Sequence, residues 1–151
     1  MAHLVAPKNR SNSLPAYFNL DGDVGAEPAA NHREDVLLVQ FAFAAMAADP
    51  PPDTSKEFFV AAAAVRPTGN MDMATIHAIR AMQIELRRLK PQTQVDGRLR
   101  PARAEDGDSD TIIDLNESIQ VRNTRVWPRI DKIAGCPMEL KSLGLRAAAR
   151  A

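Results

Sequence analysis

The apolar and polar positions of the chain predict helices that are separated by proline stops. From Val36 to Ala48 almost every position is apolar, and Asn31 with Glu34 forms a capping-box pattern before this run. Asp49 and the three prolines after it end this segment. A helix that is apolar all round is central or covered on more than one side. We therefore expect a central helix, which in so small a domain also indicates a partner surface.

A second long helix is predicted between Asn70 and Leu89. Asn70 or Asp72 can accept the first amide protons, and Pro91 places the helix end near Leu89. After the proline, residues 95–97 (Val-Asp-Gly) are typical of a turn, because glycine tolerates a positive φ. The apolar positions of the helix recur at helical spacing: Ile76, Ile79, Met82, Leu86 and Leu89.

Shorter helical segments flank this stretch. Thr54 with Glu57 is a capping-box pattern that begins a short alanine-rich helix, which ends near Arg66. Ser109 or Asp110 is expected to cap a later helix that continues to about residue 126. A further helical turn is expected over residues 130–134, and the tail over residues 138–151 has weak helical character.

Residues 1–30 contain three prolines among Asn, Ser and Gly and show no periodicity, which is typical of an extended arm. Its bulky apolar side chains either fold back on the chain's own domain or bind a neighbouring subunit. Phe41, on the very apolar first helix, is a further candidate for such a contact. The arm residues of this expected partner surface are Leu14, Tyr17, Phe18 and Leu20.

These elements predict an all-α fold, a small three-helix bundle with an extended N-terminal arm and a C-terminal tail. The expected parts are the arm over residues 1–30, the helical domain over 31–126, and a helical turn with the tail over 127–151. A length of 151 residues suffices for one domain with a core and extensions. We find no internal repeat.

Four short motifs occur in an order that resembles the peptidoglycan-binding-like domain, a small three-helix module that binds the cell wall. That family typically shows D-V-x-x-L-Q, then T-x-x-A-h-x-x-F-Q (h is apolar), then a V-D-G-x-h-G-P turn, and then a Thr-initiated helix that ends in L-N. The matching segments are Asp35–Gln40, Thr75–Gln83, Val95–Pro101 and Thr111–Asn116. The resemblance covers about residues 34–124. It implies a non-catalytic module that binds peptidoglycan or a related wall polymer.

The resemblance also implies where such a ligand would bind, in a shallow groove between the central helix and the turns. The implied ligand-binding residues are Asp96, Gly97, Arg98 and Arg100 in the turn, with Gln83 and Thr75 on the helix as supports. The alternative is that Asp96 and Gly97 form a purely structural turn. The chain departs from the family pattern at several places: Met82 replaces an aromatic, Arg100 replaces the second turn glycine, residues 104–110 are an acidic insertion, and Pro50–Gly69 replaces the first Asp-Gly turn.

Composition narrows the function classes. Nineteen basic residues balance nineteen acidic ones, so the chain has no general attraction to nucleic acid. A local basic stretch between Arg87 and Arg103 favours contact with an acidic partner protein or a wall polymer. The single Cys136 allows no intrachain disulfide. We expect no nucleic-acid partner.

No pattern of catalytic or metal-binding residues is found. His3, His32 and His77 have no second histidine or cysteine at the spacing of a zinc site. Nothing near Cys136 would lower its pKa, the carboxylates show no pairing typical of a glycosidase, and the glycines form no phosphate-binding loop. We therefore expect no enzyme activity, no metal and no cofactor.

The start of the chain lacks a Sec-type signal peptide, and no run approaches the roughly 18 apolar residues of a membrane helix. These features predict a protein synthesised in the cytoplasm, without a membrane span, that reaches the cell envelope on a particle or injection machine. A second hypothesis follows. The chain is a structural or adaptor subunit of a virion, phage tail or contractile injection machine, in which the fold serves only as scaffold. The arm and the tail would then bind other protein subunits. The two hypotheses are compatible.

Overall fold

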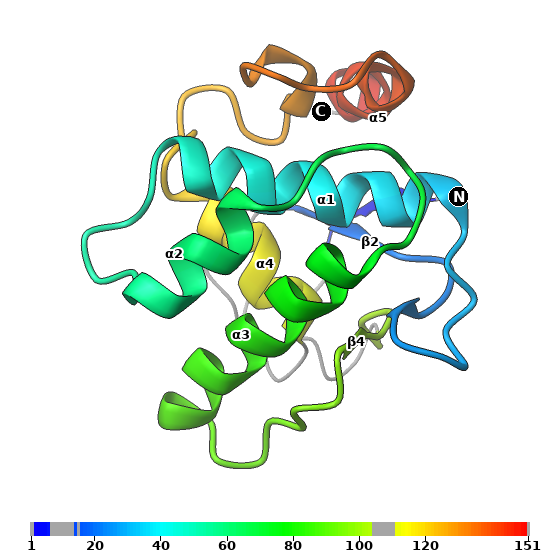
Figure 1. Ribbon diagram of the computed structural model, residues 1–151. Coiled ribbons are helices and arrows are strands. Elements are labelled where there is room, and N and C mark those ends of the chain that lie inside the picture. Colours follow the sequence, from blue (N-terminus) through cyan, green and yellow to red (C-terminus); the bar gives the residue numbers. More distant parts are fainter. Residues whose placement is uncertain (1, 7–13, 15, 104–110, 151) are drawn as a thin grey trace.

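The computed structural model describes residues 2–6, 14, 16–103 and 111–150 (Figure 1). Within these residues the chain forms five α-helices and two antiparallel two-stranded sheets. The helices are α1 (Arg33–Ala48), α2 (Lys56–Ala63), α3 (Met73–Leu89), α4 (Thr111–Gln120) and α5 (Met138–Arg150), with a 3-10 turn, η2, over Ile130–Lys132. The strands are β1 (His3–Val5), β2 (Tyr17–Asn19), β3 (Val24–Gly25) and β4 (Arg98–Leu99).

The predicted all-α three-helix bundle is therefore wrong, and the fold is a small mixed α/β one with 49% helical and 8% strand residues. β1 pairs with β2, so that Leu4 lies opposite Phe18. β3 pairs with β4, so that Val24 lies opposite Leu99. Each strand is only two or three residues long. Such strands are too short to show a two-residue alternation, and β3 and β4 lie far apart along the chain.

α1 is the central element, as its apolar sequence predicted. It lies between α5 on one side and α2, α3 and α4 on the other (Figure 1), and it packs directly against α2, α4, α5 and β3. Neighbours on several sides explain why it lacks a polar face. Its buried side chains include Val36, Leu37, Leu38, Val39, Phe41, Phe43 and Met46.

The expected capping box at the start of α1 does not form. The N-cap residue is His32, and it makes no side-chain capping bond. Asn31 instead adopts a positive φ of 50°. The side-chain Oδ1 of Asn31 accepts a hydrogen bond from the Gly25 backbone amide at 2.8 Å, and its Nδ2 donates to the Gly25 carbonyl at 3.0 Å. Asn31 therefore ties the start of α1 to β3.

The ends of α3 follow the prediction. The Asp72 side chain caps the helix by accepting a hydrogen bond from the Thr75 amide at 2.8 Å, and the helix ends at Leu89, before Pro91. In α2 the cap is Ser55, one residue after the expected Thr54. α4 ends at Gln120, earlier than expected, and the chain continues in turns.

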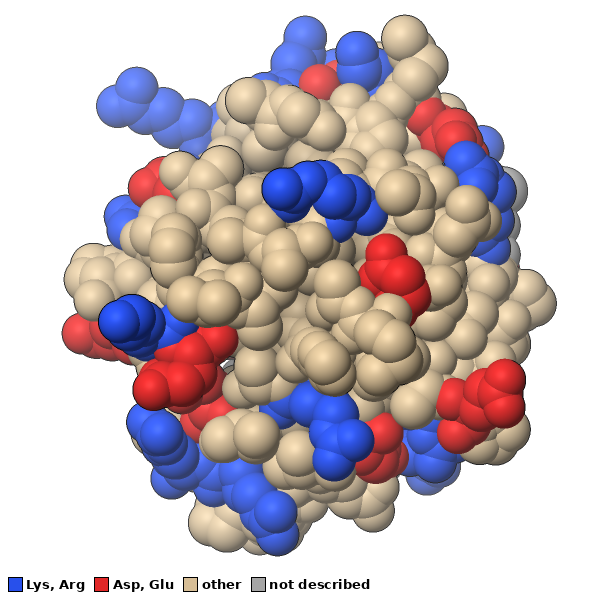
Figure 2. Space-filling view, viewed as in Figure 1, with Lys and Arg blue, Asp and Glu red and all other residues tan. Residues whose placement is uncertain are grey.

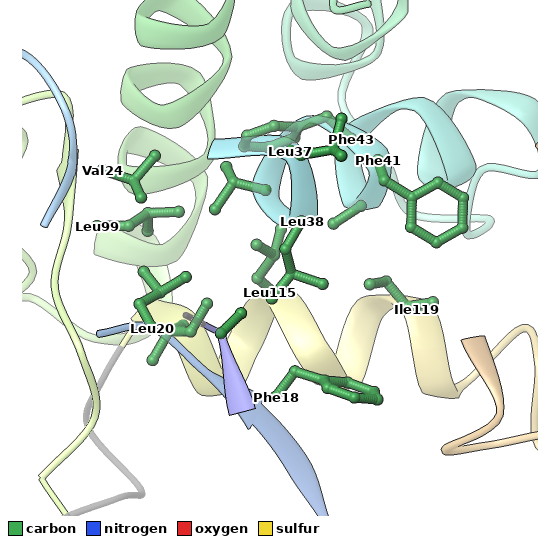
Figure 3. Packing of buried hydrophobic residues seen from close by; sticks show 14 of the residues in the cluster. Phe18, Leu20, Val24, Leu37, Leu38, Phe41, Phe43, Leu99, Leu115 and Ile119 are labelled. Carbon is green, nitrogen blue, oxygen red and sulfur yellow. The ribbon is translucent and has the colours of Figure 1, made fainter. Parts of the chain in front are cut away.

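The N-terminal segment is part of the core of the chain itself. Leu14, Tyr17, Phe18 and Leu20 are each 1–2% exposed, and Phe41 on α1 is 1% exposed. Figure 3 shows Phe18 and Leu20 close to Leu115 and Leu99 in this core. These five residues, expected as partner contacts, therefore present no surface to another subunit in this structure. Of the two alternatives given for the arm, folding back on the chain's own domain is the one that this structure shows.

A pair of hydrogen bonds and an aromatic contact fix this segment. The Asn116 side chain on α4 accepts a hydrogen bond from the Phe18 amide at 2.7 Å and donates to the Phe18 carbonyl at 2.9 Å. The Trp127 ring meets the Phe18 ring edge-on, with 5.7 Å between the ring centroids. Residues 17–19 are thus held against the start of the C-terminal region.

The C-terminal tail also packs on the chain itself. α5 contacts η2, α1 and β1, and its own side chains Leu140 and Leu143 are buried. The Arg33 guanidinium on α1 donates two hydrogen bonds to the Glu139 carboxylate, at 3.1 and 2.8 Å. The described parts of both extensions therefore cover α1.

Removal of the Phe18 ring tests the inclusion of the N-terminal segment in the core. We expect Phe18→Ala to lower the free energy of unfolding by about 3–5 kcal/mol, because it leaves a cavity between β2 and α4. The control is Leu89→Ala on α3, where the side chain is 83% exposed and the expected change is below about 0.5 kcal/mol. Urea unfolding monitored by circular dichroism gives both values. Equal, small losses would mean that residues 14–20 are not part of the core.

Candidate functional site

The candidate site is the turn from Asp96 to Arg100, which lies against α3. Gln83 on α3 is 1% exposed and makes four hydrogen bonds to this turn. Its Oε1 accepts from the amides of Asp96 and Gly97, at 3.1 and 2.9 Å. Its Nε2 donates to the Asp96 carboxylate at 3.1 Å and to the Arg98 carbonyl at 2.9 Å. All four sites of the buried amide are used, so Gln83 positions the turn and has no atom left for a ligand.

Gly97 allows the turn to approach α3 closely. Its φ is +73°, a conformation that favours glycine. A Cβ at this position would lie 3.1 Å from Ile76 Cγ2 and 3.2 Å from Arg80 Cγ. On the other side, the Gly97 carbonyl accepts a hydrogen bond from the Ala26 amide at 2.9 Å. The glycine is thus enclosed between α3 and the β3 segment.

The Asp96 carboxylate is used inside the turn. Oδ1 accepts from Gln83 and from the Arg98 amide at 3.0 Å, and Oδ2 accepts from the Arg100 guanidinium at 2.6 Å. Partial burial by itself would raise the pKa of Asp96. The hydrogen bonds from Arg100, the Arg98 amide and Gln83 outweigh burial and lower that pKa. Asp96 is therefore a charged organiser of the turn.

Asp96, Arg98 and Arg100 are the predicted site residues whose side chains reach solvent, and the Asp96 side chain is 26% exposed. The Arg100 side chain is 41% exposed and the Arg98 side chain is 25% exposed. Arg98 also lies 3.9 Å from the Asp23 carboxylate, which the sequence analysis did not connect with this site. No local signal could have done so, because the β3–β4 pairing brings Asp23 here from the far end of the chain.

Thr75, the sixth predicted site residue, lies in a second cluster on α1 and α3. It is fully buried, and its hydroxyl donates to the Asp72 carboxylate at 2.6 Å and accepts from Gln40 Nε2 at 3.1 Å. Gln40, on α1, is also fully buried. The polar contacts of Thr75 thus go to Asp72 and Gln40, and it positions these neighbouring polar groups.

Gln40 holds the segment before α3 in the same way that Gln83 holds the segment before α4. Its Oε1 accepts from the amides of Thr68 and Gly69, at 3.0 and 2.8 Å, and its Nε2 donates to the Asn70 carbonyl at 2.8 Å. Gly69 has a φ of +80°, close to that of Gly97. Residues 68–70 thus form a second glutamine-held turn with the geometry of residues 96–98. The two turns share this geometry although the sequence shows no internal repeat.

Polar residues of three of the four motifs are buried, whereas Asp96 in the turn motif and Thr111 are only partly buried. Besides Asn19, the buried polar side chains of the described chain are Asp35, Gln40, Thr75, Gln83 and Asn116. Each of these five belongs to a motif segment and bonds to backbone or to another such residue. The motif residues therefore build the fold, and ligand contact is left to the exposed side chains of the turns.

Among these five buried side chains of the described chain, Asp35 is the one with an oxygen that accepts no hydrogen bond. Its Oδ2 accepts from the amides of Asp21 and Gly22, both at 3.1 Å. Its buried Oδ1 has no hydrogen-bond partner in the described part of the chain. Burial raises the pKa of the Asp35 carboxyl, against the opposing effect of the Gly22 amide.

Other chemistry-bearing groups show no assembled site. Burial raises the pKa of the half-buried Cys136 thiol to about 11, so it is protonated at neutral pH. Within the residues that the structure describes, no group of three or more His, Cys, Asp or Glu side chains is placed to hold a metal ion. In the same residues no helix is both long enough and apolar enough to cross a membrane.

Comparison with family models, with curated proteins and with solved structures finds no match to this chain. The candidate site therefore rests on the geometry of the turn and on the motif resemblance.

Three glycines with positive φ test the packing of the turn. We expect alanine at Gly135, where nothing lies within 4 Å, to cost only backbone strain, about 1–2 kcal/mol. Gly97→Ala adds the contacts with Ile76 and Arg80 and should cost more. Gly25→Ala should cost most, because its Cβ would collide with the Gly97 carbonyl oxygen. Urea unfolding of the three variants measures this order; a Gly97→Ala loss no larger than that of Gly135→Ala would contradict it.

The pKa of Asp35 predicts the sign of a pH effect on stability. A carboxyl whose pKa is raised by folding favours the fold in its protonated form. Its contribution is present below about pH 4 and is lost as the pH rises through the raised pKa. We expect Asp35→Asn to gain stability relative to wild type between about pH 4 and about pH 7. The unfolding free energy, measured by urea titration across this range, checks this expectation.

Asp96→Asn is the matched control for Asp35→Asn, because the pKa of Asp96 is lowered. Its contribution is present above about pH 4 and is lost as the pH falls through the lowered pKa. The deficit of Asp96→Asn relative to wild type should therefore shrink in acid. Parallel pH profiles for both variants and wild type would contradict the assignment of the two carboxyl groups.

Proposed function

We propose that this protein is a non-catalytic binding module for peptidoglycan or a related wall polymer, and that the Asp96–Arg100 turn is its contact surface. The observation that carries the proposal is a turn fixed by Gln83 from beneath, with two partly exposed arginines on its outer side. A rigid turn loses little conformational entropy on binding. The motif resemblance supplies the ligand class.

The six predicted residues differ in burial and in hydrogen bonding, which supports a division of their roles under this proposal. Gln83 and Thr75 are buried, and Gly97 is enclosed by backbone and α3, so these residues position the turns. Asp96 orients its neighbouring arginines through ion pairs. Arg98 and Arg100 remain as the groups that contact the polymer.

Co-sedimentation with insoluble peptidoglycan tests the proposal. We expect saturable pelleting of the wild type that survives moderate salt. The double variant Arg98→Gln, Arg100→Gln should bind roughly 10- to 100-fold more weakly, because it loses two charge-assisted contacts. Thermal unfolding of the variant verifies that it is folded.

The matched control is Arg125→Gln, Arg146→Gln, which removes the same charge from two exposed positions outside the turn. This control should pellet like the wild type. If both double variants lost the same binding, the loss would come from the lower overall positive charge, and this would contradict the assignment of the site. A folded wild type that does not pellet at low salt would contradict the function itself.

The adaptor function remains the alternative, and one observation favours it. Large apolar side chains on α2 and α3, which pack side by side, are exposed: Phe59, Val60, Met73 and Ile84. Figure 2 shows much uncharged surface on the side viewed there, with Lys, Arg, Asp and Glu side chains both within it and around it. The described parts of the arm and the tail pack on α1, so an adaptor would use this face in their place. Absence of wall binding would direct attention to it.

A further inference from the structure

The Arg98 guanidinium is oriented by two carboxylates but hydrogen-bonded to neither. Its Nη1 lies 3.9 Å from Asp23 Oδ2, and its Nη2 lies 3.9 Å from Asp96 Oδ2. Both distances exceed that of a hydrogen bond, and no other described residue accepts one from this group. A guanidinium carries five N–H donors in a planar fork. The donors of Arg98 therefore remain available to an acceptor outside the chain.

The backbone of Arg98 is fixed on each side. Its amide donates to Asp96 Oδ1 at 3.0 Å, and its carbonyl accepts from Gln83 Nε2 at 2.9 Å. The residue also pairs with Gly25 in the β3–β4 sheet. The side chain thus starts from a rigid point, which lowers the entropic cost of using it in recognition.

The charges around the turn leave an excess of positive charge. Three arginines lie at or beside it, Arg98, Arg100 and Arg80, whose stem lies against Gly97. Two carboxylates face them, and the oxygens of Asp96 are already occupied by internal donors. An additional anion can therefore be accommodated, and a planar carboxylate matches the fork of Arg98.

We propose that this turn recognises a carboxylate group, so that the bound part of the wall is its peptide and not its uncharged glycan hydroxyls. The inference rests on the proposed function and specifies the ligand class of the same site. Arg98 makes a bidentate contact with the carboxylate. Arg100, which is paired with Asp96, adds positive charge near it.

The test compares untreated peptidoglycan with peptidoglycan whose carboxyl groups have been converted to neutral amides with carbodiimide and ethanolamine. Moderate salt is used, because it screens charges farther apart than about 8–10 Å. We expect wild-type binding to fall roughly tenfold or more on the amidated material. Arg98→Gln should show the same loss on untreated material and no further loss after amidation.

Soluble peptides identify the source of the carboxylate. A wall stem peptide with free carboxylates should displace the protein from peptidoglycan, whereas the same peptide with all carboxyl groups as carboxamides should not. Displacement by neither peptide would overturn the peptide assignment. Arg98→Lys keeps the charge but loses the fork, so we expect intermediate binding; full binding by this variant would overturn the bidentate contact.

The outcomes separate the two levels of the proposal. Equal binding to untreated and amidated peptidoglycan would overturn the carboxylate inference and leave wall binding intact. Failure of the folded wild type to bind either material would overturn the proposed function together with it. Arg125→Gln, Arg146→Gln again serves as the control and should respond to amidation as the wild type does.

Discussion

The arrangement of this chain depends on two buried glutamines that satisfy the backbone of the turns beside them. Gln40 and Gln83 each accept from two successive amides and donate to the carbonyl that follows. An unpaired amide or carbonyl in these positions would cost about 1–3 kcal/mol. Each clamp joins one helix to the turn that leads toward the next, so α1 positions the entry to α3, and α3 positions the approach to α4. Use of the same device twice gives the two helix–turn units a common geometry.

This construction separates the residues that build the turn from those that can bind. The buried amide of Gln83 has no free donor or acceptor, and Gly97 is enclosed on both faces. The residues most characteristic of the motifs are thus committed to the fold. Under the proposed function, recognition falls to Arg98 and Arg100, whose side chains are partly exposed. A chain can therefore retain the motifs, and with them the turn, while its ligand is decided by a few exposed side chains.

Local rules predicted the elements whose determinants are local. α3 runs from its Asp72 cap to Leu89 because a capping carboxylate and Pro91 lie at its ends, and the absence of a polar face correctly placed α1 at the centre. The burial of the segment around Phe18 was not predicted, because its hydrogen-bond partner Asn116 lies 98 residues away on α4. The strands were not predicted either, because they are short and β3 pairs with the distant β4. The turn at Gly69 escaped for a similar reason: its partner, Gln40, is 29 residues distant, and Thr68 replaces the expected aspartate. In the site, the turn was predicted, whereas the burial of Gln83 and Thr75 and the proximity of Asp23 were not.

The pKa shifts of two buried or partly buried carboxylates follow from the hydrogen bonds that their oxygens accept. Asp35 and Asp96 both hold backbone amides, yet their pKa values shift in opposite directions, because Asp35 has a buried oxygen without a partner and Asp96 receives Arg100. Asp96 therefore stays ionised to a lower pH than an ordinary aspartate, and it pairs with its neighbouring arginines. At 3.9 Å from Arg98, Asp23 and Asp96 attract the guanidinium without using its hydrogens. An arginine held in this way loses little freedom on meeting an anion and need not first break an internal hydrogen bond. Such an arrangement allows a protein with no net charge to select an anionic group at one point on its surface.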